Sequence, residues 1–161
     1  MSEVLTTRHL HDLGKFLLAL VMVWAYFSFS QFLIIWAGNL PEEIPYYLER
    51  LRGGWQFVSL ALVFGHFALP FALLLSRDLK RDFKLLASIA VFVMFMRLVD
   101  LYWVVAPNYL PGALGVAWLD LAAPLGLIGL WLAYFFMQLE KRALVPVNDP
   151  NLEGALEHGR E

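Results

Sequence analysis

This chain of 161 residues contains no cysteine, and it has few charged residues. The lack of cysteine excludes disulfides, cysteine-ligated zinc, iron–sulfur clusters bound by this chain and thiol catalysis. Charged residues make up 16% of the sequence and hydrophobic residues 60%, whereas soluble domains average about 25% and about 45–50%. The composition therefore indicates that lipid, rather than water, surrounds most of the folded chain.

Histidine is also scarce, which limits the chemistry that the chain can perform. Only His66 lies within a long apolar run, whereas His9 and His11 precede the first run and His158 lies near the C-terminus. A bis-histidine haem in a membrane would need two such histidines at matching depth. No metal-binding spacing, phosphate-binding loop or nucleophile-with-base pattern is present. We therefore expect no catalytic residue, and no metal or cofactor bound by this chain.

Four apolar runs cover residues 16–36, 55–75, 85–106 and 113–137. Each reaches the roughly 20 residues that a helix needs to cross a bilayer. Strands of a membrane barrel alternate apolar and polar residues, so these uniform runs indicate helices. The sequence predicts an all-α membrane protein whose four transmembrane helices form one up-down bundle. The bundle would occupy residues 1–144, and residues 145–161 would form an extended cytoplasmic tail.

The positive charges predict an orientation. The loop at residues 77–84 carries four Lys and Arg residues, whereas the loop at residues 107–112 carries none. Short cytoplasmic loops are enriched in Lys and Arg, so both termini are expected inside the cell. The first external loop, residues 41–52, is expected to hold a short interfacial helix that starts near Pro41 and ends at Gly53-Gly54.

Five polar residues lie within the four runs, one or two on each helix: Gln31, His66, Arg97, Asp100 and Asp120. Ionisable residues in spans are costly, so they usually face the bundle interior and often mark function. The rise per residue places Asp100 and Asp120 at a similar depth, roughly 10 Å below the outer surface. Arg97 lies three residues before Asp100, on the same helix face. The group is either an ion-pair network, a proton relay open to the outer side, or part of a quinone headgroup site.

Two of these five polar residues are each followed by a proline four positions later. Pro70 lies four residues after His66, and Pro124 lies four residues after Asp120. Proline has no N–H, so the carbonyls of His66 and Asp120 would lose their helical donors. His66 itself is either a hydrogen-bonded packing residue or a proton carrier.

An ordered series of motifs along nearly the whole chain resembles one known family. The motifs are RHLHDLGK (8–15), WAYFSFSQFLIIW (24–36), GNLPEE (38–43), GGW (53–55), HFALPF (66–71), LSRDLK (75–80), MRLVDLYW (96–103) and VPVNDP (145–150). Together they resemble the C-terminal membrane region of the F subunit of alternative complex III, a bacterial quinol:electron-acceptor oxidoreductase. This subunit is a polysulfide-reductase-type (NrfD-like) membrane protein. Family members are longer, so the chain is expected to be a split subunit, a truncated product or a stand-alone relative.

The resemblance implies a location and partners. The chain would be a multi-pass protein of the bacterial inner membrane and would bind other membrane subunits and cytochrome c or iron–sulfur subunits, which hold the redox centres. Quinone or quinol would bind, if at all, at an interface with a partner subunit. No nucleic acid is expected as a partner.

The leading hypothesis is a membrane subunit of a respiratory quinol-oxidising complex. It would contribute packing surface and a candidate proton path, and it would not be an enzyme alone. The alternatives are a small self-associating transporter or channel, and a scaffold or assembly protein.

Overall fold

The computed structural model describes residues 7–110, 114–141, 150 and 154, and every regular element in this part of the chain is helical. The chain divides into two compact units, one formed by Thr7–Leu114 and the other containing the residues from Gly115 onward. Each unit is described by itself. The predicted tail of residues 145–161 lies outside the described residues, apart from positions 150 and 154.

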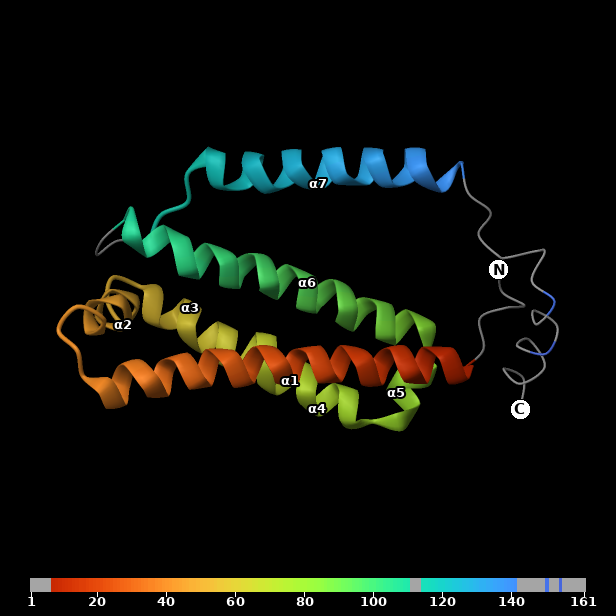
Figure 1. Ribbon diagram of the computed structural model, residues 1–161, viewed down its shortest axis with the longest axis horizontal. Coiled ribbons are helices and arrows are strands. Elements are labelled where there is room, and N and C mark those ends of the chain that lie inside the picture. Colours follow the sequence, from red (N-terminus) through yellow and green to blue (C-terminus); the bar gives the residue numbers. More distant parts are fainter. Residues whose placement is uncertain (1–6, 111–113, 142–149, 151–153, 155–161) are drawn as a thin grey trace. The chain divides into compact units, whose positions relative to one another are not determined.

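The first unit has three long helices lying side by side (Figure 1). The first is α1 (Thr7–Gly38), and the second is a continuous rod of α3 (Trp55–Ala61), the π-helix η1 (Leu62–Ala68) and α4 (Leu69–Leu75). The third is α6 (Phe83–Val105), which is extended by the short 3-10 helix η2 (Ala106–Asn108). The short helix α2 (Ile44–Arg50) lies at one end of the unit, and α5 (Arg77–Arg81) lies at the other, beside the start of α1. The second unit contains α7 (Trp118–Leu139).

The four predicted apolar helices are present. The helices that are long and apolar enough to cross a membrane are Thr7–Gly38, Trp55–Leu75, Phe83–Asn108 and Trp118–Leu139. The first begins at Thr7 rather than at residue 16, because hydropathy marks the part of a helix that suits lipid and not its polar extension. The fourth begins at Trp118 rather than at residue 113. The single four-helix bundle, the domain boundaries and the orientation of the termini stay predictions.

The core of the first unit is small. It is formed by Leu74, Leu86 and Ile89, with partly buried Leu17 and Val93 among the side chains packed against it. Most other large apolar side chains of the long helices are exposed. A soluble monomer rarely exposes contiguous apolar patches above a few hundred Å². These helix faces are therefore suited to lipid or to other protein helices.

The turns follow the local sequence signals. The predicted helix of the first loop is present as α2, which begins at Ile44, three residues after Pro41, and has Pro45 in its first turn. Gly53 and Gly54 follow it with φ angles of 62° and 99°, a conformation that glycine adopts at little cost. At the start of α6, the Asp82 side chain accepts hydrogen bonds from the backbone N–H groups of Lys84 and Leu85, at 2.8 and 3.1 Å. That cap fixes where α6 begins.

The π-helix η1 interrupts the second long helix and contains His66. In this segment the hydrogen bonds span five residues instead of four, and the N–H of Leu69 donates to the carbonyl of Phe64. The segment ends at Ala68, next to Pro70, which cannot donate the helical hydrogen bond to the His66 carbonyl. The proline signal noted in the sequence thus coincides with a local change of helical register.

Candidate functional site

Asp100 of α6 is the centre of a polar cluster inside the first unit. Asp100 is only 5% exposed. Its Oδ2 atom accepts a hydrogen bond from Nε1 of Trp24 on α1, at 3.1 Å. The same oxygen forms an ion pair with Nη1 of Arg97, one turn earlier on α6, as the spacing of three residues predicted. The buried carboxylate therefore has two donors, one from each of two helices.

Arg97 is the exposed member of this pair. Its side chain is 52% exposed, whereas that of Asp100 is 8% exposed. A guanidinium facing lipid costs about 2.5–3.5 kcal/mol on insertion scales and more in simulations. Within the first unit the packing covers the carboxylate and leaves half of the arginine open, and the prediction that Arg97 faces the interior of a four-helix bundle stays a prediction.

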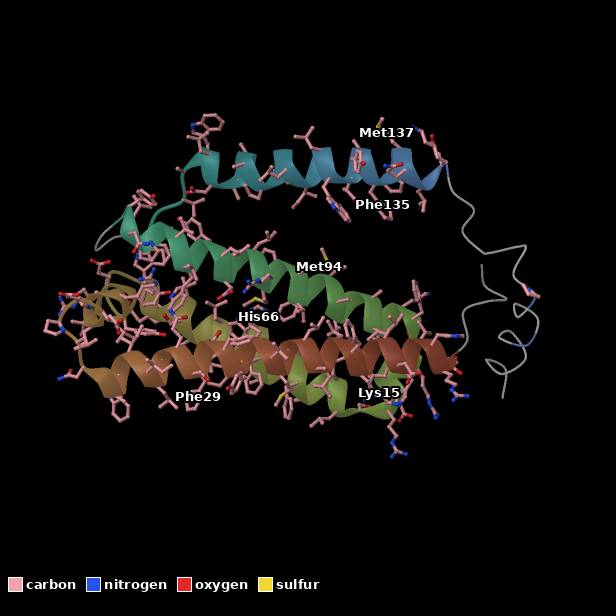
Figure 2. The ribbon with its side chains drawn as sticks, in the orientation of Figure 1. Lys15, Phe29, His66, Met94, Phe135 and Met137 are labelled. Atoms are coloured by element: carbon pink, nitrogen blue, oxygen red, sulfur yellow. The ribbon has the colours of Figure 1, made fainter. Side chains whose placement is uncertain are left out.

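His66 of η1, which belongs to the second long helix, is also part of the cluster (Figure 2). Its imidazole stacks on the indole of Trp24, with ring centroids 4.1 Å apart and planes 23° from parallel. The residue is 3% exposed, and its Nδ1 atom is buried with no hydrogen-bond partner in the described part of the chain. Asp100 and Arg97 both lie within electrostatic range of the ring. The cluster thus contains a buried carboxylate and a buried imidazole, joined through one tryptophan.

Close helix packing positions this cluster. Gly65 of η1 lies against Met96 of α6, and a Cβ atom added at Gly65 would lie 3.0 Å from the Met96 methyl group. A larger residue at position 65 would force the end of the Met96 side chain to shift. η1 carries His66 and α6 carries Asp100, so this contact lies between two of the helices that hold the cluster.

Gln31 lies outside this cluster, and Asp120 is described within its own unit. Gln31 is exposed on α1, about 10 Å further along the helix than Trp24. Asp120 belongs to the second unit and lies in the first turn of α7. Its Oδ2 accepts a hydrogen bond from the backbone N–H of Ala117, at 2.8 Å. There the carboxylate satisfies a free N–H and interacts favourably with the helix dipole.

A second buried polar site lies at the junction of α2 and α6, and sequence reasoning missed it. Arg50 is 0% exposed. Its guanidinium donates hydrogen bonds to the carbonyl oxygens of Tyr46, Trp103 and Val104, at 2.7, 3.2 and 2.6 Å. It also lies over the rings of Tyr46 and Trp103, at 3.5 and 5.2 Å from the centroids. In the sequence Arg50 is one of two arginines in the first loop, and its position there gives no indication of burial.

A proline supplies the signal that could have found the Arg50 site. Pro107 follows Trp103 by four residues and has no N–H, so the carbonyl of Trp103 has no helical donor. Nε of Arg50 donates a hydrogen bond to this carbonyl instead of a helical N–H. The indole of Trp103 in turn donates to the hydroxyl of Ser59 on α3, at 2.8 Å. Arg50 and Trp103 thereby tie α2, α3 and the end of α6 together.

Burial shifts the pKa values of three side chains at this junction. Burial lowers the pKa of Arg50, and the charges of Tyr46 and Glu49 partly offset that shift. Burial raises the pKa of Tyr46 and of Tyr47. An arginine remains ionised at neutral pH even so. Arg50 therefore acts as a fixed cation, paired with carbonyl oxygens and aromatic faces.

The described residues do not bring metal-ligand groups together. In residues 7–110 and 114–141, no three His, Asp or Glu side chains lie close enough to hold a metal ion. The interactions that the structure shows at the Asp100 cluster are a hydrogen bond, an ion pair and a ring stack.

No protein-family model matches the chain, and no curated protein matches it significantly. The likeness to the F subunit of alternative complex III thus depends on the ordered motifs of the sequence. Several residues of these motifs, Trp24, His66, Arg97 and Asp100, form the polar cluster described above.

Proposed function

We propose that this protein is a membrane subunit of a respiratory quinol-oxidising complex related to alternative complex III, located in the bacterial inner membrane. One observation carries the proposal: the buried Asp100 cluster opens onto the half-exposed Arg97 within an apolar helix. A cation in that position needs a protein or water partner instead of lipid. A neighbouring subunit that packs against this face of α6 would supply it.

The proposal extends to a proton path. A buried carboxylate and a buried imidazole joined through Trp24 combine two groups that can exchange protons. Asp120 is a third candidate because its carboxylate is half-buried at the start of an apolar helix. Redox centres and any quinone site would belong to partner subunits or to interfaces with them.

The main test is purification of the tagged full chain from its native membranes. Co-purified subunits with c-type haem and iron–sulfur spectra, together with quinol:acceptor activity, are the expected result. A pure homo-oligomer without these cofactors would contradict the proposal and favour a self-associating transporter. The half-exposed Arg97 is the observation that favours this second function, because a charge between protomers could line a pore.

The proton path has its own test. Asp120→Asn keeps the shape and hydrogen-bonding capacity of the side chain but cannot ionise. If Asp120 carries protons, the variant complex should assemble normally and show a lower proton-to-electron ratio in reconstituted vesicles. If Asp120 is only an ion-pair partner, stability should fall and the ratio should not. Normal stability with an unchanged ratio would exclude both roles.

The orientation can be tested directly because the chain has no cysteine. Single cysteines at Ser76 and Asn108 place one reactive thiol in each of the two loops. In intact cells, an impermeant reagent should label position 108 and leave position 76 unlabelled. The opposite labelling would overturn the proposed placement of both termini in the cytoplasm.

A further inference from the structure

The end of the first unit where α5 lies beside α1 carries a concentration of positive charge. Residues 7–18 and 76–84 contain six cationic side chains and three carboxylates. The cations are Arg8, Lys15, Arg77, Lys80, Arg81 and Lys84, and the carboxylates are Asp12, Asp78 and Asp82. Figure 2 shows Lys15 on the part of α1 that lies beside α5.

Two of the three carboxylates already have partners. Asp12 forms an ion pair with Lys15, at 3.1 Å. Asp82 accepts the two backbone hydrogen bonds that cap α6. Among the described residues, neither Lys80 nor Arg81 has a carboxylate within ion-pair distance. The positive charge of α5 is therefore left largely uncompensated.

The junction between α1 and α5 is shaped around Lys80. This lysine is only 6% exposed. Its stem lies across Gly14, where an added Cβ atom would lie 2.6 Å from Cγ and 2.9 Å from Cδ of the lysine. Glycine at position 14 thus leaves the space in which the lysine stem is buried, as long charged side chains do at membrane interfaces.

An imidazole lies among these cations. The charges of Lys15, Lys80 and Arg81 all act on His11 of α1. Its Nδ1 atom is buried and has no hydrogen-bond partner in the described part of the chain. Cations from two helices thus act on one imidazole whose buried Nδ1 lacks a partner in the described part of the chain, and the mutual repulsion of these cations would be relieved by a bound anion.

We propose that this junction binds the phosphate of an anionic phospholipid headgroup, held by Lys80 and Arg81 of α5 and by His11 of α1. A lipid fits better than free phosphate because exposed apolar residues flank α5 in the chain. Leu75 ends α4 and Phe83 begins α6; they are 58% and 63% exposed, and they would lie along the acyl chains. Basic sites at the ends of membrane helices bind anionic headgroups in this way. The proposal does not rest on the proposed respiratory function or on the orientation of the chain.

The test measures lipid binding to the full-length protein in detergent by native mass spectrometry. Phosphatidylglycerol is the anionic probe, phosphatidylcholine is the zwitterionic control, and inorganic phosphate is the competitor. Each cation near a membrane surface contributes about fivefold in affinity. We expect Arg81→Gln to weaken phosphatidylglycerol binding about fivefold, and the Lys80→Gln, Arg81→Gln double variant about 25-fold.

Two further variants test the geometry. Gly14→Ala should displace Lys80 and weaken phosphatidylglycerol binding without any change of charge. Arg52→Gln removes an exposed cation near the other end of the unit and should leave binding unchanged. Arg81 is exposed, so its variant should fold, which unchanged helical circular dichroism would verify.

Three results would overturn the proposal. The first is that phosphatidylcholine binds as tightly as phosphatidylglycerol. Arg52→Gln could weaken binding as much as Arg81→Gln, which would show a general charge effect. Inorganic phosphate at millimolar concentration could displace the lipid completely, which would assign the site to a free anion.

Discussion

Replacing Arg50 with methionine should destabilise the protein more than any other single charge removal in the first loop. The substitution keeps an apolar stem of similar length and removes the guanidinium. Three hydrogen bonds and two contacts with aromatic faces are lost. The carbonyl of Trp103 is left with no donor, because Pro107 cannot replace the one that Arg50 supplied.

The magnitude follows from the groups left unpaired. A buried acceptor that loses its partner costs about 1–3 kcal/mol. The carbonyls of Trp103 and Val104 are affected, and the amide of Asn108 donates a long hydrogen bond of 3.4 Å to the Val104 carbonyl. Each aromatic contact contributes about 0.5–2 kcal/mol. Methionine recovers part of the loss through apolar burial, so the expected net cost is about 3–5 kcal/mol.

The assay is unfolding in mixed micelles with increasing sodium dodecyl sulfate, followed by circular dichroism. Arg52→Met is the matched control, because Arg52 is exposed on the same loop and should cost less than about 0.5 kcal/mol. Arg50→Lys should fall between the two, since one ammonium cannot reproduce the fork of donors. If Arg50→Met costs less than about 1 kcal/mol, or no more than Arg52→Met, the junction of α2 and α6 does not depend on this side chain.

Three further outcomes are expected. Gly65→Val should lower the free energy of unfolding by about 1–3 kcal/mol in the same assay, because the valine side chain would overlap Met96. Gly38→Val is the control, since nothing lies within 4 Å of an added Cβ there. An equal cost at position 38 would show that close packing is not the reason. Asp100→Leu should destabilise more than Asp100→Asn, since the amide oxygen can still accept the Trp24 hydrogen bond; equal loss of unfolding free energy would contradict that bond. Burial raises the pKa of Tyr46, so the unfolded chain ionises first and stability should fall as the pH rises from about 10 through the folded pKa. Absorbance titration of tyrosinate measures this, and Tyr46→Phe should reduce both the loss of stability and the delayed ionisation.

Local patterns in the sequence determined much of this protein. The apolar runs predicted the four long helices, because burial of the backbone in lipid requires a helix of that length. The spacing of Arg97 and Asp100 predicted their ion pair, because three residues along a helix bring side chains together. Pro41 and the glycine pair at 53–54 predicted a short helix between them, and α2 (Ile44–Arg50) lies within those limits. Each of these features depends on residues close together in the chain.

Only the tertiary structure decided which polar groups meet. Trp24 and Asp100 are 76 positions apart, and Arg50 and Val104 are 54 apart. A membrane helix has nearly the same hydropathy on every face, so the sequence predicts how long it is but not which face packs. The burial of Arg50 could not be predicted from the sequence, because burial of a cation depends on acceptors that the fold brings from elsewhere.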